Sequence, residues 1–118
     1  MSKQKKLKNK ADTLWSKIIR FYGECEKCGK KGGNLHAAHI YSRRYAKTRH
    51  DLENGLCLCW PCHRRGHDRP VDFTHWVEDY LGEDTVQSIG KKAKSLAKPM
   101  DYEPVVKELK DIWKRMND

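Results

Sequence analysis

The chain has 118 residues, of which 37% are hydrophobic and 35% are charged, and its formal net charge is +9. This length fits one compact domain, and a core so small often needs a metal ion or disulfides to stabilise it. No apolar run approaches the about 20 residues that a membrane-spanning helix needs, and no signal-peptide pattern follows the N-terminus. We therefore expect a cytoplasmic protein whose cysteines bind metal rather than form disulfides.

The positive charge is concentrated in the first two thirds of the chain. Residues 1–10 carry five Lys and no acidic residue, whereas residues 70–118 have more acidic than basic side chains. Such an uneven distribution indicates a polyanionic partner, of which nucleic acid is the commonest. The alternative is that the basic residues serve only solubility.

A helix is predicted near the N-terminus, after a flexible basic arm over residues 1–12. Apolar side chains recur at helical spacing from Leu14 to Tyr22, and Gly23 ends the pattern. Asp12 stands at the position of an N-cap. We therefore expect this helix to span residues 13–22.

The central part of the chain predicts a small α+β unit. Gly residues and the pair Asn54-Gly55 separate its elements, and Pro residues mark the first turn and the end of its helix. In chain order, the expected elements are a knuckle over 25–33, a strand over 34–40, a basic loop over 41–53, a second strand that starts over 56–58, and a short helix between Pro61 and Pro70.

The C-terminal third predicts three further helices. Apolar residues at helical spacing indicate a helix from Phe73 to Leu81, a second over 84–97 and an amphipathic third from Val105 to Met116. Their aromatic side chains are expected in the core rather than in ligand contacts.

Two Cys-x-x-Cys pairs predict a structural zinc site. Each two-residue gap in Cys25/Cys28 and Cys59/Cys62 lets both sulfurs reach one ion, and four thiolates complete a tetrahedron. Free thiols are the alternative. A Cys2His2 finger fits badly, because the spacing that follows the first pair is too short. Cys57 has no paired partner, and we interpret it as a small buried apolar residue.

Five of the six His fall between positions 36 and 67. His63 and His67 are four residues apart on the predicted helix, so both imidazoles face the same side. This is metal-ligand spacing, and it directly follows a Cys-x-x-Cys pair. A lone His would more often be structural, but the pair favours a metal site.

These motifs, taken together, resemble the HNH (ββα-metal) endonuclease family, and phage and prophage members in particular, including relatives of the phage recombination protein NinG. The resemblance implies a small α+β fold with a zinc-stapled ββα-metal core over 13–72 and a C-terminal helical segment over 73–118 packed on it. The stretches that carry the resemblance are Cys25–Cys28, Leu35-His36-Ala37-Ala38-His39-Ile40, Glu53-Asn54-Gly55-Leu56-Cys57-Leu58-Cys59-Trp60-Pro61-Cys62-His63, and His67.

The resemblance also implies the roles of the site residues. His39 matches the general base, which takes a proton from the water that attacks a phosphorus atom. Asn54 matches the motif Asn, which braces the loop that holds the base. His63, with His67 beside it, matches the ligand of a catalytic divalent cation, which is Mg²⁺, Mn²⁺, Ni²⁺ or Zn²⁺. The expected reaction is one-metal hydrolysis of a DNA phosphodiester that leaves a 3′-hydroxyl and a 5′-phosphate.

One position departs from the family pattern. Many members carry an Asp or His ligand directly before the base, and this chain has Ala38 there. Residues 36 and 38 of a strand point to the same face, so His36 is the candidate third ligand. The alternative is a two-histidine site completed by water and a DNA phosphate.

The expected partner is DNA, with no membrane, and the chain is expected to be a monomer or weak homodimer in the cytoplasm, of the host if the protein is phage-encoded. The rival hypotheses are a zinc-dependent DNA-binding module without catalysis, and an accessory protein of phage packaging or recombination that binds terminase or recombination proteins. The residues expected to contact DNA phosphates are Arg43, Arg44, Lys47, Arg49, Arg64 and Arg65.

Overall fold

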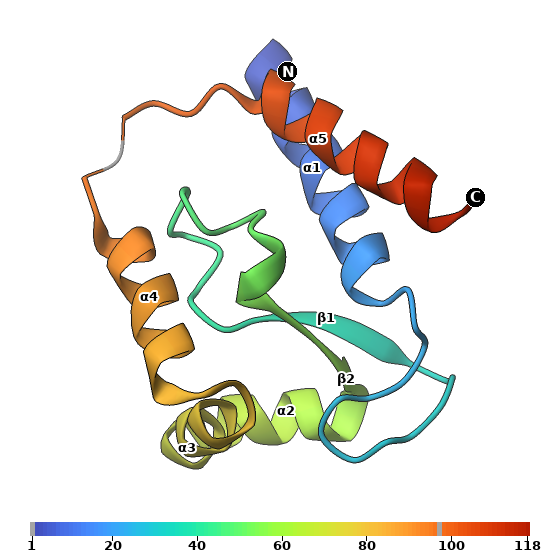
Figure 1. The fold of residues 1–118 in the computed structure, drawn as a ribbon, viewed down its shortest axis with the longest axis vertical. Coiled ribbons are helices and arrows are strands. Elements are labelled where there is room, and N and C mark those ends of the chain that lie inside the picture. Colours follow the sequence, from blue (N-terminus) through green and yellow to red (C-terminus); the bar gives the residue numbers. More distant parts are fainter. Residues whose placement is uncertain (1, 97) are drawn as a thin grey trace.

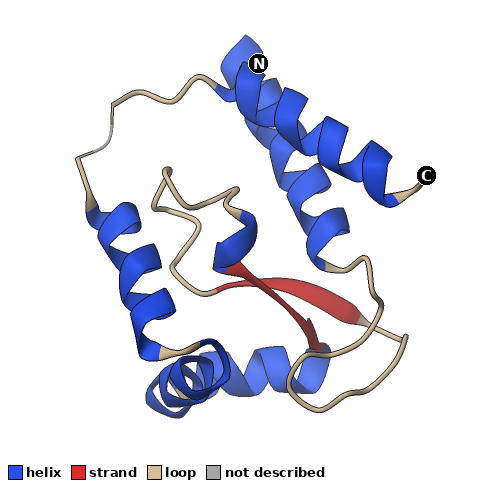
Figure 2. Ribbon diagram, in the orientation of Figure 1, coloured by secondary structure: helices blue, strands red, loops and turns tan. Residues whose placement is uncertain are grey.

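The computed structural model of the protein describes residues 2–96 and 98–118. A two-stranded antiparallel sheet lies at the centre, with helices around it (Figures 1 and 2). The α+β fold expected from the sequence is confirmed. The elements are α1 (Lys3–Ile19), β1 (Leu35–His39), the 3-10 helix η1 (Leu52–Asn54), β2 (Gly55–Cys59), α2 (Trp60–Asp68), α3 (Pro70–Leu81), α4 (Glu83–Lys94) and α5 (Tyr102–Met116).

The two strands form a hairpin whose two faces pack against different hydrophobic clusters. The register pairs Ala38 with Leu56 and His39 with Gly55, and successive side chains of a strand point to opposite faces. Ala38, Leu56 and Leu58 are buried in one hydrophobic cluster, whereas Ala37 packs against a second cluster that includes residues of α1. The hairpin thereby presents His39 on the side of α1.

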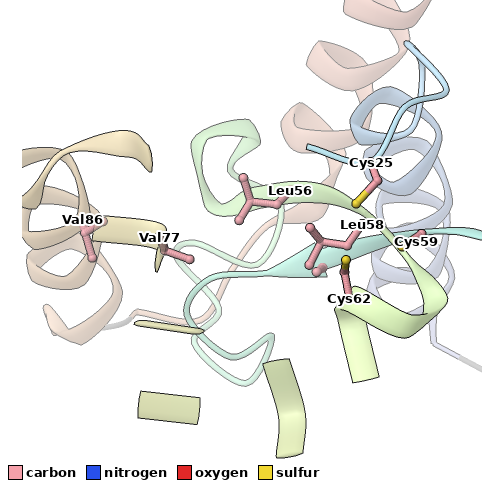
Figure 3. Close-up of a cluster of buried hydrophobic side chains, with 8 residues drawn as sticks. Cys25, Leu56, Leu58, Cys59, Cys62, Val77 and Val86 are labelled. Carbon is pink, nitrogen blue, oxygen red and sulfur yellow. The ribbon is translucent and has the colours of Figure 1, made fainter. Parts of the chain in front are cut away.

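The first hydrophobic cluster lies between the hairpin and helices α2, α3 and α4 (Figure 3). Leu56, Leu58 and Val77 are at most 2% exposed, and full burial of such a side chain contributes about 1.5–3 kcal/mol. Cys25 and Cys62 belong to the same cluster. The apolar core and the cysteine site are therefore built as one unit.

The second cluster joins the two ends of the chain. α1 and α5 lie side by side and run in the same direction (Figure 1). Ala11 and Trp15 of α1 pack with Val106 and Leu109 of α5 in this cluster. At the start of both helices, the Lys3 ammonium lies 3.5 Å from a Glu103 carboxylate oxygen.

The prediction of a flexible arm over residues 1–12 was wrong for the described part of that segment; Met1 lies outside the described residues. α1 begins at Lys3, and the Ser2 hydroxyl accepts a hydrogen bond of 3.1 Å from the backbone N–H of Lys5 as an N-cap. Leu7 and Ala11 continue the apolar stripe of the helix towards its N-terminus and pack in the cluster with α5. The Lys-rich segment is helical because α5 covers this stripe, which the sequence by itself does not show.

The predicted helices downstream are confirmed, with shifted ends. α2 ends at Asp68, and Pro70 is the first residue of α3. Proline suits this position because a backbone N–H in the first turn has no partner within the helix. The helix predicted over 84–97 corresponds to α4, which ends at Lys94. Residue 97 lies outside the described residues. No helix of the described part is both long and apolar enough to cross a lipid bilayer.

Candidate functional site

Four cysteines converge where the knuckle over 25–33 meets β2 and α2. The sulfur atoms of Cys25, Cys28, Cys59 and Cys62 all lie within 4.8 Å of one another, and those of Cys28 and Cys59 are 3.7 Å apart. Among residues 2–96 and 98–118, no other group of three or more His, Cys, Asp or Glu side chains brings all its ligand atoms this close together. The two predicted metal-binding pairs are therefore brought together, and Figure 3 shows three of the four cysteines, Cys25, Cys59 and Cys62, near Leu58.

The chemistry of this sulfur cluster fits a structural zinc ion. Burial alone would raise the pKa of the Cys25 thiol, but backbone N–H groups, first that of Cys28, lower it to about 6. Burial and the neighbouring thiols raise the pKa of Cys62 to about 12. Four sulfurs this close cannot all be anionic without a cation, and Zn²⁺ is the ion that four thiolates hold in a tetrahedral structural site.

Cys57 lies outside this cluster, as the sequence predicted. Its side chain is buried, and burial raises the pKa of its thiol. The Cys57 backbone N–H donates to a Glu26 carboxylate oxygen at 2.6 Å, and the Glu26 N–H donates to the Cys57 carbonyl at 2.8 Å. Cys57 therefore helps to attach the knuckle to β2 through its backbone.

A cavity of about 700 Å³ lies next to the hairpin and contains the predicted catalytic histidines. Its walls come from α1, β1, the loop after β1, α2 and the start of α3. The charged and aromatic side chains that line it include Asp12, Trp15, His39, Arg43, Arg49, His63, His67 and Phe73. His39, His63 and His67 therefore face one solvent-accessible space.

His39 is held by a hydrogen bond and by an aromatic stack. Its Nε2 lies 2.9 Å from the carbonyl oxygen of Arg49, and because a carbonyl can only accept, Nε2 carries the proton. Nδ1 is then the basic nitrogen of the neutral ring. The ring stacks on Trp15 with centroids 4.0 Å apart, and burial lowers the pKa of His39 below its ordinary value, which favours the neutral base.

Asn54 occupies the position expected for a residue that braces the loop. It is fully buried, and its amide makes three hydrogen bonds. The Tyr41 N–H donates to Asn54 Oδ1 at 2.8 Å, while Asn54 Nδ2 donates to the carbonyls of Tyr41 and Thr48, each at 3.0 Å. These bonds join both ends of the segment between β1 and β2, in which Arg49 lies.

His36, His63 and His67 form a chain of ring contacts. His63 Nε2 lies 3.2 Å from His67 Nε2, and His63 Nδ1 lies 2.8 Å from His36 Nδ1. His36 Nε2 in turn lies 3.2 Å from Asn34 Oδ1, which can only accept. His36 therefore carries its proton on Nε2, His63 on Nδ1, and the Nε2 lone pair of His63 faces His67.

This arrangement fits a cation shared by His63 and His67. Two imidazole nitrogens that are each about 2.1 Å from one ion lie about 3.0–3.4 Å apart, which agrees with the 3.2 Å between the two Nε2 atoms. Burial, followed by the neighbouring imidazoles, lowers the pKa of His63 and favours the neutral ring that metals bind. His36 meets the opposite nitrogen of His63, so this geometry favours it as a hydrogen-bond partner over the expected role of third ligand.

The predicted DNA-contacting residues differ in their surroundings. Arg43 and Arg49 line the cavity, but the Arg49 guanidinium forms a bidentate ion pair with Asp12 at 2.8 and 2.7 Å. Of the others, Arg44 lies over Tyr45, Lys47 donates to Ser95, Arg64 lies over Trp60, and Arg65 is exposed.

Two residues at this site were not identified from the sequence as site residues. Asp12 was expected to cap a helix, and it instead lies inside α1 with its carboxylate on Arg49 and His50. Trp15 lies in the helix expected over 13–22 and was assigned no role; it is buried in the second cluster and stacks on His39. No local pattern marks either residue, because their partners lie 24 or more positions away in the chain.

Comparison with known proteins agrees with this geometry. The model of the HNH endonuclease family matches residues 25–69, a segment that contains the four cysteines, His39, Asn54, His63 and His67. No curated protein and no solved structure matches the chain. The matched segment ends before α3 and begins after α1.

Proposed function

We propose that this protein is a DNA endonuclease that hydrolyses phosphodiester bonds with a divalent cation and His39 as general base. The observation that carries the proposal is the shared cavity. His39, in the tautomer that leaves Nδ1 basic, lines the same 700 Å³ space as the nitrogen pair of His63 and His67. All three residues lie in the segment that matches the HNH endonuclease family.

In the proposed reaction, His39 Nδ1 takes a proton from water as the water oxygen attacks the phosphorus. The bond from phosphorus to the 3′ oxygen breaks, and the products are a 3′-hydroxyl and a 5′-phosphate. A divalent cation, when bound, stabilises the negative charge that develops on the phosphoryl group and on the leaving oxygen. His63 and His67 would hold that cation, and Arg43, whose side chain lines the cavity, would contact a phosphate of the same strand.

His36 has an orienting role in this proposal. Its Nδ1 accepts a hydrogen bond from the Nδ1–H of His63, so the Nε2 lone pair of His63 remains available as a ligand. Partners of this kind fix the tautomer and orientation of metal-binding histidines in many proteins. Water and the DNA phosphate would then complete the coordination, as oxygen ligands suit Mg²⁺ and Mn²⁺.

One observation favours a second candidate function. Ala38, which stands where many family members have a ligand, is 3% exposed and packed in the hydrophobic cluster with Leu56 and Leu58. A metal site with only two protein ligands binds its ion weakly, and a chain that has lost catalysis would retain the zinc unit and the basic surface. The second candidate is therefore a zinc-stabilised DNA-binding module without catalysis.

A plasmid-nicking assay distinguishes the two functions. Supercoiled plasmid is incubated with the zinc-loaded chain in Mg²⁺ or Mn²⁺, with EDTA as the metal-free reference, and the relaxed and linear forms are quantified. We expect relaxed plasmid first, because one site cuts one strand and a linear product needs two encounters or a dimer. His39→Ala should lower the nicking rate by about 10²–10⁴-fold.

His75 provides a matched control. It is an exposed histidine on α3 and is not among the residues that line the cavity. His75→Ala should nick at the wild-type rate. If the wild-type protein binds DNA and leaves plasmid supercoiled with every divalent cation, the DNA-binding module is the correct function. If His39→Ala nicks as fast as the wild type, His39 is not the base.

A further inference from the structure

Three consecutive residues of the loop before β2 are attached to α1. The Arg49 guanidinium and the His50 imidazole both contact the Asp12 carboxylate, His50 through Nε2 at 2.6 Å. The indole N–H of Trp15 donates to the carbonyl of Asp51 at 2.9 Å. Figure 1 shows α1 beside η1, which directly follows this loop. A single helix therefore holds the loop at three successive positions.

The attachment surrounds the peptide group that binds the proposed base. The carbonyl that accepts the His39 Nε2–H belongs to Arg49, so it lies in the peptide unit between Arg49 and His50. Asp12 binds the side chains on both sides of that unit. These contacts restrain the two residues that flank the peptide unit whose carbonyl faces His39.

Two features of the contact between Asp12 and His50 lower the stability of the fold. Aspartate is a poor residue for the interior of a helix. His50 is 8% exposed, and its Nδ1 is the buried side-chain polar atom that lacks a hydrogen-bond partner within the described part of the chain. Burying such an atom unpaired disfavours folding. An apolar pair at these two positions would avoid both effects, so a positioning function explains them better than stability does.

We propose that Asp12 is a positioning residue for His39, acting through Arg49 and His50. It aims the Arg49 carbonyl at the His39 Nε2–H, which keeps Nδ1 as the basic nitrogen, while Trp15 on the next turn of α1 supports the ring by stacking. α1 lies outside the segment that matches the HNH family, so the base depends on a helix that the matched segment lacks. The catalytic part of this inference rests on the proposed nuclease function.

The first test separates DNA binding from the chemical step in the full-length, zinc-loaded protein. Asp12→Asn keeps the size of the side chain and removes its charge. We expect the single-turnover nicking rate of saturated complex to fall by about tenfold or more, because small errors in the position of a catalytic group are costly. The dissociation constant for a DNA duplex should be unchanged or lower, since a negative charge has been removed from the wall of the cavity.

Two further variants make this test specific. Asp12→Glu keeps a carboxylate and should retain more of the rate than Asp12→Asn. Asp111→Asn removes an exposed acidic charge from α5 and should retain the wild-type rate. If Asp12→Asn does not fold, Arg49→Lys replaces it, because it keeps the backbone carbonyl and the positive charge but cannot form the bidentate pair. A wild-type rate for the folded variant would overturn the proposal.

The second test needs neither DNA nor catalysis, so it distinguishes failure of this inference from failure of the nuclease function. Long-range ¹H–¹⁵N NMR spectra of the histidine rings report which nitrogen carries the proton. Wild-type His39 should show the Nε2–H tautomer alone, and Asp12→Asn should show a mixture of tautomers. An unchanged tautomer would overturn the proposal even if the protein is a nuclease. A mixed tautomer in a protein that never nicks would refute only the nuclease function.

Discussion

The replacement of Asn54 by alanine tests the hydrogen-bond bracing of the loop that binds His39. Asn54 is 0% exposed, and its amide accepts one hydrogen bond from Tyr41 and donates one each to Tyr41 and Thr48. Asn54→Ala removes all three bonds at once. The two carbonyls and the N–H lose their partner in an interior that water does not readily reach.

The expected loss of stability follows from these contacts. A typical intramolecular hydrogen bond contributes about 1 kcal/mol net, so three bonds give about 3 kcal/mol. The unsatisfied backbone groups and the space left by the amide raise the expected loss to about 3–5 kcal/mol. Asn54→Asp should be at least as destabilising at neutral pH, because it places an anionic oxygen against two carbonyl oxygens.

Urea unfolding at a fixed excess of zinc measures this loss. The midpoint should fall while the dependence of the unfolding free energy on urea stays constant, which shows that stability rather than compactness has changed. Asn117→Ala is the matched control, since Asn117 is exposed and donates to Trp113 at the end of α5. It should change the free energy of unfolding by no more than about 0.5 kcal/mol. A loss below about 1 kcal/mol for Asn54→Ala would refute the reasoning.

Four further predictions concern zinc, pH, DNA binding and the divalent cation. Cys28→Ser should abolish the one bound zinc per chain and unfold the protein, because structural zinc contributes on the order of 10 kcal/mol; a folded, zinc-free variant in metal analysis and circular dichroism would contradict this. The pKa of His39 lies below its ordinary value of 6.5 because of burial, so the neutral base predominates at pH 7 and the nicking rate should fall only as the pH drops through that lower pKa. A rate profile with an apparent pKa above 7 would exclude His39 as the base. Lys5 and Lys8 line a second hollow of about 390 Å³ beside the cavity, and changing both to Gln should make the salt dependence of DNA affinity shallower by about 2 in slope; an unaltered slope would mean that this surface does not meet DNA. His36→Ala should raise the metal concentration for half-maximal nicking without abolishing activity, whereas a wild-type metal titration would show that His36 has no influence on His63.

Substitution of Lys5 and Lys8 is the sounder test of the basic N-terminus because this segment is not an arm. Deleting residues 2–10 would remove the N-cap and the first part of α1, including Leu7, which packs in the cluster with α5, and Gln4, which bonds to Asp101 and Tyr102 at the start of α5. The resulting loss of stability would be mistaken for a loss of DNA contacts. The helical structure of the segment therefore decides how its charge can be tested.

Spacing along the sequence was enough to predict the groups whose members lie only a few residues apart. Each Cys-x-x-Cys pair, and the four-residue interval between His63 and His67, constrains ligands within one turn of chain, and the structure brings these groups together. The hairpin and the helices α2, α3, α4 and α5 were predicted for the same reason, since their apolar periods and their Gly and Pro boundaries are local.

The partners of α1 could not be predicted in this way. Asp12 contacts Arg49 and His50 from 37 and 38 positions away, and Trp15 reaches Asp51 from 36 positions away. Arg49 was expected to contact DNA phosphate, and the structure pairs it with Asp12. An isolated basic residue in a loop gives no indication of which carboxylate the tertiary fold will bring to it.

The sequence by itself determined which chemical groups this protein offers: four cysteine thiols in two Cys-x-x-Cys pairs, two imidazoles four residues apart, and a further histidine at position 39. Only the tertiary structure decided how that chemistry is oriented. It set the His39 tautomer through the Arg49 carbonyl, turned His36 towards Nδ1 of His63, and placed α1 against the loop that binds His39. The physical reason is that residue identity and short spacing define which ligands and bases exist. The orientation of a ring depends on hydrogen bonds from segments that meet only when the core packs.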